Sequence, residues 1–434
     1  MSTELYLDTA RLGRMCRGAR TAEQEFGWLV GQLGSSLYLE RFLSHGFRSL
    51  PGRFARRVPG LKCWPGVAGF RQALGRFVRQ PTGLPMHFFG QSFALIRFAA
   101  QCLFDKSHRV MVTDLAWPAY VRVLQQVATE KDRELCLIPL RHIVMSDRAN
   151  KADVVRHLSQ AYQRYQCDGL FLSDITYLGI KLPVKELLAE LMPSNPRFVV
   201  IDGAQAFHQR TVDLSSLNCD LYLAGTQKWF GAYHPLRLAF IGRGTNSATI
   251  EEIRRKWSGD HPDALFEFCH AVQHAEFASF GETVNVSPLI AAAGALQQAR
   301  RQANSLNDPW EVLLINARSL ADWIGDPFCR PVRQHDSLAS GILLLSAKRP
   351  GGESETRARS ALARSGIIAS AFPNGLLRLS MPRYYLPLRQ RTLISRALHR
   401  SFHSPAVEKP HDVGHLRERS ISSHSNGDLC RRTC

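Results

Sequence analysis

The chain has 434 residues, of which 45% are hydrophobic and 21% are charged, and this is enough apolar sequence for one large domain and a smaller one. No run of eighteen apolar residues occurs, and the first residues lack the pattern of a secretory signal, so we expect a cytoplasmic protein without a membrane partner. The formal net charge of +18 raises nucleic acid as a partner, but the arginines are scattered and accompany no nucleic-acid-binding motif, which favours a generally basic surface without that partner.

The middle of the chain alternates short apolar runs with helical patterns, which is typical of a mostly parallel α/β sheet. We expect strands at Val110–Thr113, Leu135–Leu140, Gly169–Leu172, Phe198–Ile201, Leu221–Ala224 and Leu238–Ile241. The helices expected between them are Ser92–Phe104, Ala119–Thr129, Ala152–Tyr165 and Val184–Met192. Ligands of such sheets bind beyond the carboxyl ends of the strands, so a site is expected there.

After Gly244 the pattern changes to longer helices, and a second, smaller α/β region follows. Its expected elements are helices at Val286–Ala303, Pro309–Trp323 and Glu353–Arg364 and strands at Gly341–Ser346 and Leu376–Ser380. We therefore expect an N-terminal segment (1–60) that packs with the small domain, a large domain (61–285), a small domain (286–403) and a tail (404–434).

The cysteines and the tail give no sign of a metal site. Ten cysteines include no CxxC pair, so neither a zinc framework nor a disulfide scaffold is expected. The tail holds several histidines and the close pair Cys430 and Cys434, a combination that metal capture would use. Its few apolar residues cannot offset the entropy of ordering, which favours disorder instead.

One stretch, VIDGAQAFHQRTVDLSSLNCDLYLAGTQKWF, places an aspartate and a lysine after successive strand patterns. Asp202 follows FVVI and Lys228 follows LYLA. A lysine is nucleophilic only when unprotonated, and the end of a buried strand favours a lowered pKa, which suits a Schiff base. If the carbonyl partner is pyridoxal phosphate, a carboxylate beside the ring nitrogen keeps that nitrogen protonated, with roughly 4 kcal/mol for an ion pair at ~4 Å.

DGAQ at 202–205, the CD pair at 219–220 and Lys228 resemble the fold-type-I pyridoxal-phosphate enzymes of aminotransferase class V, which include the cysteine desulfurases. The similarity extends to about residue 400 and is strongest in the middle of the chain. It implies a large domain with a mostly parallel seven-stranded sheet, a smaller α/β C-terminal domain and pyridoxal 5'-phosphate as cofactor. It also implies a Schiff base at the catalytic Lys228 and a homodimer with a shared active site.

The resemblance assigns cofactor contacts on three loops. Gly90, Gln91 and Ser92, in HFFGQSFAL, match the turn that holds the phosphate at a helix N-terminus, although any strand–turn–helix junction carries such residues. Trp117 matches the aromatic residue that stacks on the pyridoxal ring, and the alternative is a core tryptophan. Thr176 and Gln205 match residues near the phenolic oxygen, and the alternative for Thr176 is a turn hydroxyl.

Four further residues are assigned by the same resemblance. Thr226 and Gln227 take the place of the Ser and His groups that contact phosphate and ring. Thr283, in FGETVNVSP, matches the threonine that reaches the phosphate from the neighbouring subunit, with a glutamate where the family has glycine. Arg378, in GLLRLSMP, matches the arginine that binds the substrate α-carboxylate, and the alternative is a surface arginine.

Two departures from the family bear on the reaction. Cysteine desulfurases need a cysteine shortly before the carboxylate-binding arginine, and none lies between Ser346 and Arg378. After the lysine, the usual glycine-rich turn is replaced by GAYHPLR, in which Tyr233, His234 and Arg237 would shape a substrate pocket, transfer protons or pack against a partner subunit.

The expected function is chemistry at the α-carbon of an amino acid, with transamination first. A lyase, epimerase or decarboxylase of the same family is the alternative, because all share the same cofactor chemistry. From another class, a non-catalytic protein that keeps the fold for binding, or a basic scaffold, is the rival. Retention of both Asp202 and Lys228 argues against that rival.

Overall fold

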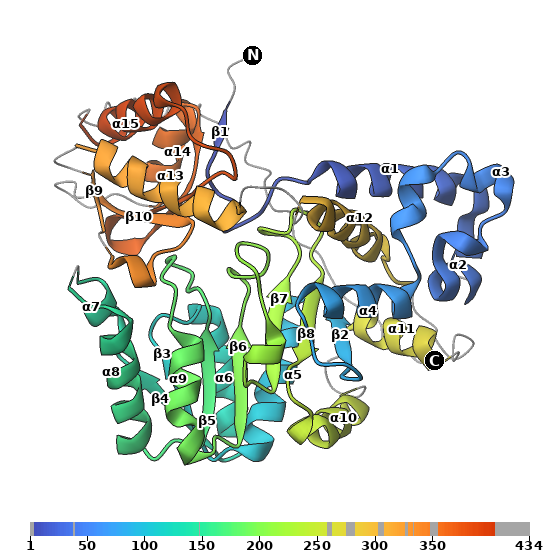
Figure 1. Cartoon of the computed structure of the whole chain (residues 1–434), viewed down its shortest axis with the longest axis horizontal. Helices are drawn as coiled ribbons and strands as arrows, with labels where there is room; N and C mark the ends of the chain where they lie inside the picture. Colours follow the sequence, from blue (N-terminus) through green and yellow to red (C-terminus); the bar gives the residue numbers. More distant parts are fainter. Residues whose placement is uncertain are drawn as a thin grey trace, which may run out of the picture.

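A computed structural model describes residues 4–37, 40–146, 148–257, 263–274, 283–302, 308–325, 329–332, 334–347 and 355–403. The large domain is built on a seven-stranded sheet, at the lower part of Figure 1. In spatial order its strands are β2 (Met86–Phe89), β8 (Arg237–Ile241), β7 (Leu221–Gly225), β6 (Phe198–Asp202), β5 (Gly169–Ser173), β3 (Arg109–Thr113) and β4 (Glu134–Ile138). Only β8 runs antiparallel to its neighbours, so the expected mostly parallel seven-stranded sheet is confirmed.

Helices cover both faces of this sheet (Figure 1). One face packs against α5 (Ser92–Lys106), α6 (Pro118–Glu130) and α10 (Ser247–Lys256), and the other against α4 (Val67–Phe77), α8 (Lys151–Arg164), α9 (Val184–Leu191) and α11 (Ala264–His274). The run FVVI in β6 explains why: Phe198 and Val200 belong to the first core, Val199 and Ile201 to the second. A strand buried on both faces reads as a continuous apolar run because its side chains alternate between the faces.

The small domain carries a four-stranded antiparallel sheet. Its order is β12 (Ser370–Phe372), β13 (Leu376–Ser380), β10 (Ile342–Ala347) and β9 (Cys329–Pro331), with helices α13 (Pro309–Trp323), α14 (Glu355–Arg364) and α15 (Leu388–His403). The N-terminal strand β1 (Leu5–Tyr6) pairs in parallel with β11 (Ile367–Ile368) of this domain. The beginning of the chain is therefore held against the small domain.

The N-terminal helices lie beside the large domain, at the right of Figure 1. They are α1 (Arg17–Leu33), α2 (Glu40–His45) and α3 (Gly52–Ala55), and α1 packs along α12 (Ser287–Gln302). A Cβ at Gly18 would lie 2.4 Å from the carbonyl oxygen of Gly294, and one at Gly294 equally close to that of Gly18. These two glycines allow the helices to approach this closely.

The predicted elements agree with the structure within a few residues, and one difference has a local cause. The strand predicted to reach Leu140 ends at Ile138, because the Asp114 carboxylate accepts hydrogen bonds from the N–H groups of Leu140 and Arg141 and turns the chain into α7 (Arg141–Val144). Strand β2, at the sheet edge, and the short strands β1, β9, β11 and β12 are not among the predicted strands. The predicted disordered tail lies outside the described residues.

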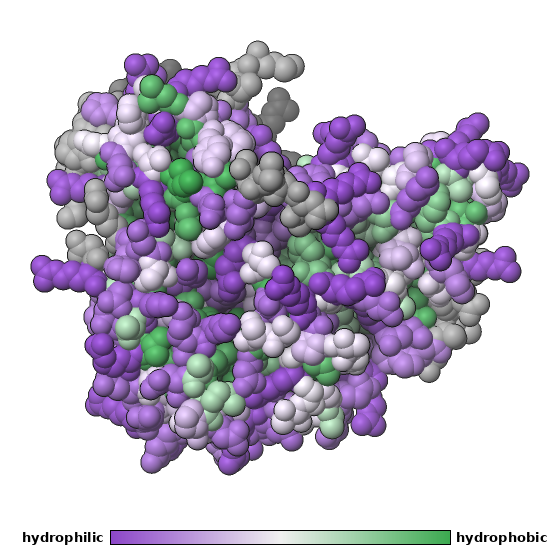
Figure 2. All heavy atoms as spheres, viewed as in Figure 1, coloured by the Kyte–Doolittle hydropathy of each residue, from purple (hydrophilic) through white to green (hydrophobic). Residues whose placement is uncertain are grey.

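The face of the molecule in Figure 2 is mostly hydrophilic, with apolar areas of limited size. Most large apolar side chains are accordingly in the three buried clusters that fill the two domains. Within the described ranges, no helix combines the length and apolar character that crossing a membrane requires.

Candidate active site

A cavity of about 390 Å³ lies at the carboxyl ends of the parallel strands, between the large and small domains. Seven of the sequence-predicted residues line it: Ser92, Trp117, Asp202, Gln205, Gln227, Lys228 and Arg378. They come from α5, the start of α6, the ends of β6 and β7 and the late strand β13. The fold therefore brings together residues that are far apart in the sequence, such as Ser92 and Arg378. This is expected for a site at the carboxyl edge of the sheet.

Asp202 is the last residue of β6 and is 7% exposed. Burial raises the pKa of its carboxyl, while the N–H of Ala204, 2.9 Å from Oδ1, and the Lys228 amine act in the opposite direction. A Cβ at Gly203 would lie 2.2 Å from the Tyr222 ring, so this position of the DGAQ motif requires glycine. Asp202 is thus a buried carboxylate at the wall of a cavity, and no cation of the described residues lies within 4 Å of it.

Lys228 follows β7 on a loop held by the N-terminal segment. The Gly13 N–H donates to the carbonyl of Gln227 at 2.7 Å, and a Cβ at Gly13 would lie 1.9 Å from the carbonyl oxygen of Lys228. Burial lowers the pKa of Lys228 to about 8; Asp202 opposes this shift, and Arg378 and Arg237 add to it. The amine is therefore unprotonated in a useful fraction near neutral pH, which a nucleophilic lysine needs.

The ring-binding part of the cavity has aromatic and amide groups. Trp117, 40% exposed, meets the Tyr177 ring edge-on at a centroid distance of 5.2 Å. The Gln205 amide is fixed on both sides: its Nε2 donates to the carbonyl of Ala10 at 2.7 Å, and its Oε1 accepts from the Trp229 indole at 2.9 Å. An open indole face suits stacking of a flat ring.

Arg378 is 4% exposed, and three groups from different parts of the chain hold its guanidinium. Its guanidinium donates to the carbonyl of Tyr177 (2.8 Å) and to Ser370 Oγ (3.1 Å) and lies 3.7 Å from the Asp8 carboxylate. Burial lowers its pKa to about 10, so it stays charged at neutral pH. Its Nε is buried and has no hydrogen-bond partner within the described ranges, so a donor remains for a ligand.

The other predicted residues do not line this cavity. The N–H groups of Gly90 and Gln91 are taken by the Asp263 carboxylate at 2.9–3.0 Å. The Thr176 hydroxyl accepts from the N–H of Ile180, and Thr226 donates to the carbonyls of His234 and Leu236. Thr283 is exposed, and the preceding residues 275–282 are outside the described part.

The bulky residues after the lysine separate in the structure. His234 Nε2 forms a hydrogen bond with the Glu23 carboxylate of α1, and Tyr233 is 47% exposed with a positive φ of 63°. Arg237 instead reaches the cavity, where its Nε donates to Ser92 Oγ at 2.5 Å. Of the three, only Arg237 is placed to contact a ligand in the cavity.

Sequence reasoning missed several residues of the site. Asp8 and Ser370 orient Arg378, with Ser370 Oγ donating to the Asp8 carboxylate at 2.5 Å, and Tyr120 lies beside Ser92. Arg11 and Arg359 line the mouth on the small-domain side. The one available signal was the acidic residue in the apolar N-terminal stretch LYLDTA; the pairing itself joins residues more than 360 positions apart.

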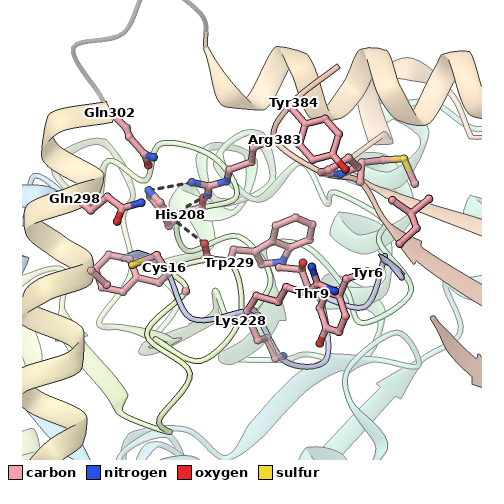
Figure 3. A pocket seen from close by; sticks show the side chains of 18 of the residues that line it. Tyr6, Thr9, Cys16, His208, Lys228, Trp229, Gln298, Gln302, Arg383 and Tyr384 are labelled. Atoms are coloured by element: carbon pink, nitrogen blue, oxygen red, sulfur yellow. Dashed lines mark hydrogen bonds between the residues drawn. The ribbon is translucent and has the colours of Figure 1, made fainter. Parts of the chain in front are cut away.

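A second cavity, of about 710 Å³, lies on the other side of the lysine loop. Figure 3 shows Lys228 at its lower edge, with Arg383 and His208 hydrogen-bonded above it. Burial lowers the pKa of Arg383 to about 10 and that of His208 to about 3, so the histidine is neutral there. Asp202 and Arg378 do not line this second cavity. The carboxylate of Asp202, the amine of Lys228 and the guanidinium of Arg378 therefore meet at the first cavity, the one of about 390 Å³.

The residues of the first cavity fit pyridoxal phosphate. A carboxylate suits the ring nitrogen, an amine the aldehyde, an indole the ring face and a helix N-terminus the phosphate. Gln227 Oε1, Arg237 Nη1 and Arg378 Nε are buried without a hydrogen-bond partner in the described part of the chain, so the cavity offers unused polar groups. No group of three His, Cys, Asp or Glu residues suited to a metal ion occurs in that part.

Comparison with known proteins agrees with this arrangement. The family model for aminotransferase class V matches residues 92–233, which include Ser92, Asp202 and Lys228. No curated protein matches the chain by sequence.

Among solved structures, three relatives show the range of similarity. The cysteine desulfurase CsdA from Escherichia coli has a TM-score of 0.67 at 16% identity, covering 92% of this chain and 95% of its own. The cystine C-S lyase C-DES has a TM-score of 0.67 at 14% identity, covering 92% and 98%. Ureidoglycine-glyoxylate aminotransferase from Bacillus subtilis has a TM-score of 0.62 at 13% identity, covering 92% of each chain.

The fold is that of the fold-type-I pyridoxal-phosphate enzymes, since whole-chain similarity extends to enzymes of this class. The resemblance to aminotransferase class V inferred from the sequence is confirmed by the family match. The similar structures include a desulfurase, a lyase and an aminotransferase, so this class is broader than any one reaction.

Proposed function

We propose that the protein binds pyridoxal 5'-phosphate and acts at the α-carbon of an amino acid, with transamination as its reaction. The proposal is carried by one observation: Asp202, Lys228 and Arg378 line the same cavity at the carboxyl ends of the strands. When bound, the cofactor supplies the electron sink for bond cleavage at the α-carbon.

Each of the three residues has a distinct task. Lys228 forms the resting covalent bond to the cofactor and, once released, its amine moves the proton at the α-carbon. The Asp202 carboxylate holds a proton on the ring nitrogen. Arg378 binds the α-carboxylate of the substrate and thereby fixes which substituent of the α-carbon faces the amine.

The residues around Arg378 support a reaction other than desulfuration. Ser370 and Arg378 are cross-strand partners in β12 and β13, and the short connection between these strands, 373–375, contains no cysteine. Among the described residues, no cysteine lines the cavity beside the arginine to act as a desulfurase-type nucleophile. We further propose a cytoplasmic homodimer in which Thr283 of one protomer serves the site of the other.

A screen of amino acids against the holoenzyme tests the reaction. Transamination converts the cofactor to its amino form, with loss of the visible band and release of a 2-oxo acid without ammonia. Release of ammonia with the 2-oxo acid would identify a lyase instead, and inversion of the α-carbon an epimerase. A wild-type protein that stays colourless with added pyridoxal phosphate would refute the proposed cofactor and support a binding or scaffold role.

Arg378→Lys is expected to raise KM for the amino acid by about 10- to 100-fold, because a lysine cannot make the two parallel hydrogen bonds of the guanidinium. The visible band of the bound cofactor should remain. Steady-state kinetics check this, and the corresponding amine without an α-carboxylate is the control. Its kcat/KM should be equal in wild type and variant; an equal loss for both substrates would contradict the carboxylate-binding role.

The rate of cofactor capture by the apoprotein is expected to rise with pH and to level off above a midpoint near 8. The pKa of Lys228 is lowered to about 8, and only the unprotonated amine attacks the aldehyde. In Asp202→Asn the midpoint should move lower, since the Asp202 carboxylate raises the pKa of Lys228. Stopped-flow measurement of the visible band across pH checks both; a midpoint above 10 would show an amine in an ordinary environment.

A further inference from the structure

Arg237 is a partly buried cation at the end of the candidate active site where α5 begins. It is the first residue of β8, and its guanidinium points into the cavity beside Ser92, where Nε donates to Ser92 Oγ at 2.5 Å. Its Nη1 is buried and makes no hydrogen bond within the described ranges. A Cβ at Gly225, on the adjacent strand, would lie 3.3 Å from this Nη1.

Several other arginines with largely buried side chains are compensated by a carboxylate, whereas Arg71 and Arg383 donate hydrogen bonds to neutral groups. Arg97, Arg243 and Arg378, with side chains 8%, 18% and 5% exposed, each lie within 4 Å of a carboxylate. For Arg237, no such carboxylate occurs in the part of the chain that the structure describes. A buried charge without a counter-ion is costly, so its retention beside a cavity indicates an anionic ligand.

The neighbouring polar groups point to the same end of the cavity. Tyr120 lies next to Ser92, and burial raises its pKa to about 12, so its hydroxyl stays neutral and keeps its proton for donation. The first N–H groups of α5, which begins at Ser92, have no partners within their own helix. This end therefore presents donors together with the Arg237 guanidinium, which has no carboxylate within 4 Å among the described residues.

The turn before α5 explains why an additional cation is needed. Asp263 accepts hydrogen bonds from the N–H groups of Gly90 and Gln91 and from that of Phe266. Two of the backbone donors expected to hold the phosphate are thus already used, and by a negative charge. A phosphate at the start of α5 would have to be received by Ser92, the helix N–H groups that follow and a nearby cation.

We propose that Arg237 binds the phosphate group of the cofactor, together with Ser92 and the N-terminus of α5. The inference rests on the proposed function, because it takes pyridoxal phosphate as the ligand. It assigns to the GAYHPLR segment a role in cofactor binding, through the residue at its end.

The test compares pyridoxal phosphate with pyridoxal, which lacks the phosphate, as ligands of the apoprotein. Absorbance titration of wild type and Arg237→Met should show an affinity for pyridoxal phosphate weakened by roughly 100-fold, as for loss of a charged partner. The affinity for pyridoxal should change by less than about threefold. Arg237→Lys should lie between wild type and Arg237→Met, because it keeps the charge without the fork.

Arg359→Met is the matched control, because Arg359 lines the small-domain end of the same cavity. Its ratio of the two affinities should equal that of wild type. As a second measurement, inorganic phosphate should raise the thermal unfolding temperature of apo wild type but not of apo Arg237→Met. This comparison also shows whether the variant is folded.

The outcomes separate the two proposals. If Arg237→Met keeps its affinity for pyridoxal phosphate, or loses affinity for both ligands equally, Arg237 does not bind the phosphate, while the proposed cofactor stands. If wild type binds neither ligand covalently, the proposed function fails and this inference falls with it.

Discussion

Lys228→Ala is expected to abolish the visible absorption band that wild type acquires with pyridoxal phosphate. Lys228 is the lysine that lines the candidate active site in the described part of the chain, and burial lowers the pKa of its amine to about 8. Without this amine, no covalent bond to the aldehyde forms in the cavity. The cofactor still fits, because its other contacts come from other residues, so non-covalent binding should remain detectable by fluorescence.

The same variant should lose at least about 10²- to 10⁴-fold in kcat, the range that a positioned general base contributes. Loss of the covalent bond adds to this, since Lys228 has both tasks in the proposed function. Amino-acid turnover under saturating cofactor measures the effect. Exogenous methylamine should restore part of the activity, since a small amine fits the space that the side chain leaves.

Lys181→Ala is the matched control for this prediction. Burial also lowers the pKa of Lys181, but its amine lies over the Trp310 ring, with 5.8 Å to the centroid, and outside both cavities that border Lys228. The band should therefore persist in Lys181→Ala. A band that survives in Lys228→Ala and disappears in Lys181→Ala would show that Lys181, and not Lys228, forms the covalent bond to the cofactor.

The architecture could be predicted because its signals are local. The apolar runs of β5, β6 and β7 fit strands buried on both faces, and the helices between them carry a helical apolar period. Residues directly after such strands must lie at one edge of the sheet. Asp202 and Lys228 therefore follow from strand positions alone, and the structure places both at one cavity.

Contacts between distant segments could not be predicted in this way. The capture of the Gly90 and Gln91 N–H groups depends on Asp263, which follows them by more than 170 residues. The orientation of Arg378 depends on Asp8, from the opposite end of the chain. Thr176 shows that a local sequence can also be ambiguous. Its hydroxyl accepts a hydrogen bond from the backbone N–H of Ile180 in the same turn, and the sequence SDITYLG fits this structural role as well as a contact with the cofactor.

Asp202→Asn is expected to separate activity from stability. At an effective dielectric of about 20, a carboxylate at ~4 Å from a protonated ring nitrogen contributes roughly 4 kcal/mol, so kcat should fall by about 10³-fold. The asparagine is nearly the same size and still accepts the hydrogen bond from the Ala204 N–H. The cavity should therefore keep its shape and still bind the cofactor.

The stability of the apoprotein should change in the opposite direction. Burial raises the folded-state pKa of Asp202 above its ordinary value, so the ionised carboxylate is less favourable in the folded than in the unfolded chain. The stability that this raised pKa confers is present only below the unfolded pKa and is lost as pH rises through the folded pKa. At neutral pH the asparagine removes that cost, so the free energy of unfolding of the apo variant should equal or exceed that of wild type.

Urea unfolding of both apoproteins and steady-state kinetics of both holoenzymes measure the two effects. Asp213→Asn is the control, because this aspartate caps a short helical turn, its side chain is 30% exposed, and it is not among the residues that line the cavity. It should leave kcat unchanged. If Asp202→Asn loses both stability and activity, the carboxylate stabilises the fold, and the proposed role is contradicted. If kcat falls while the free energy of unfolding is retained, the carboxylate acts on the cofactor and destabilises the apoprotein.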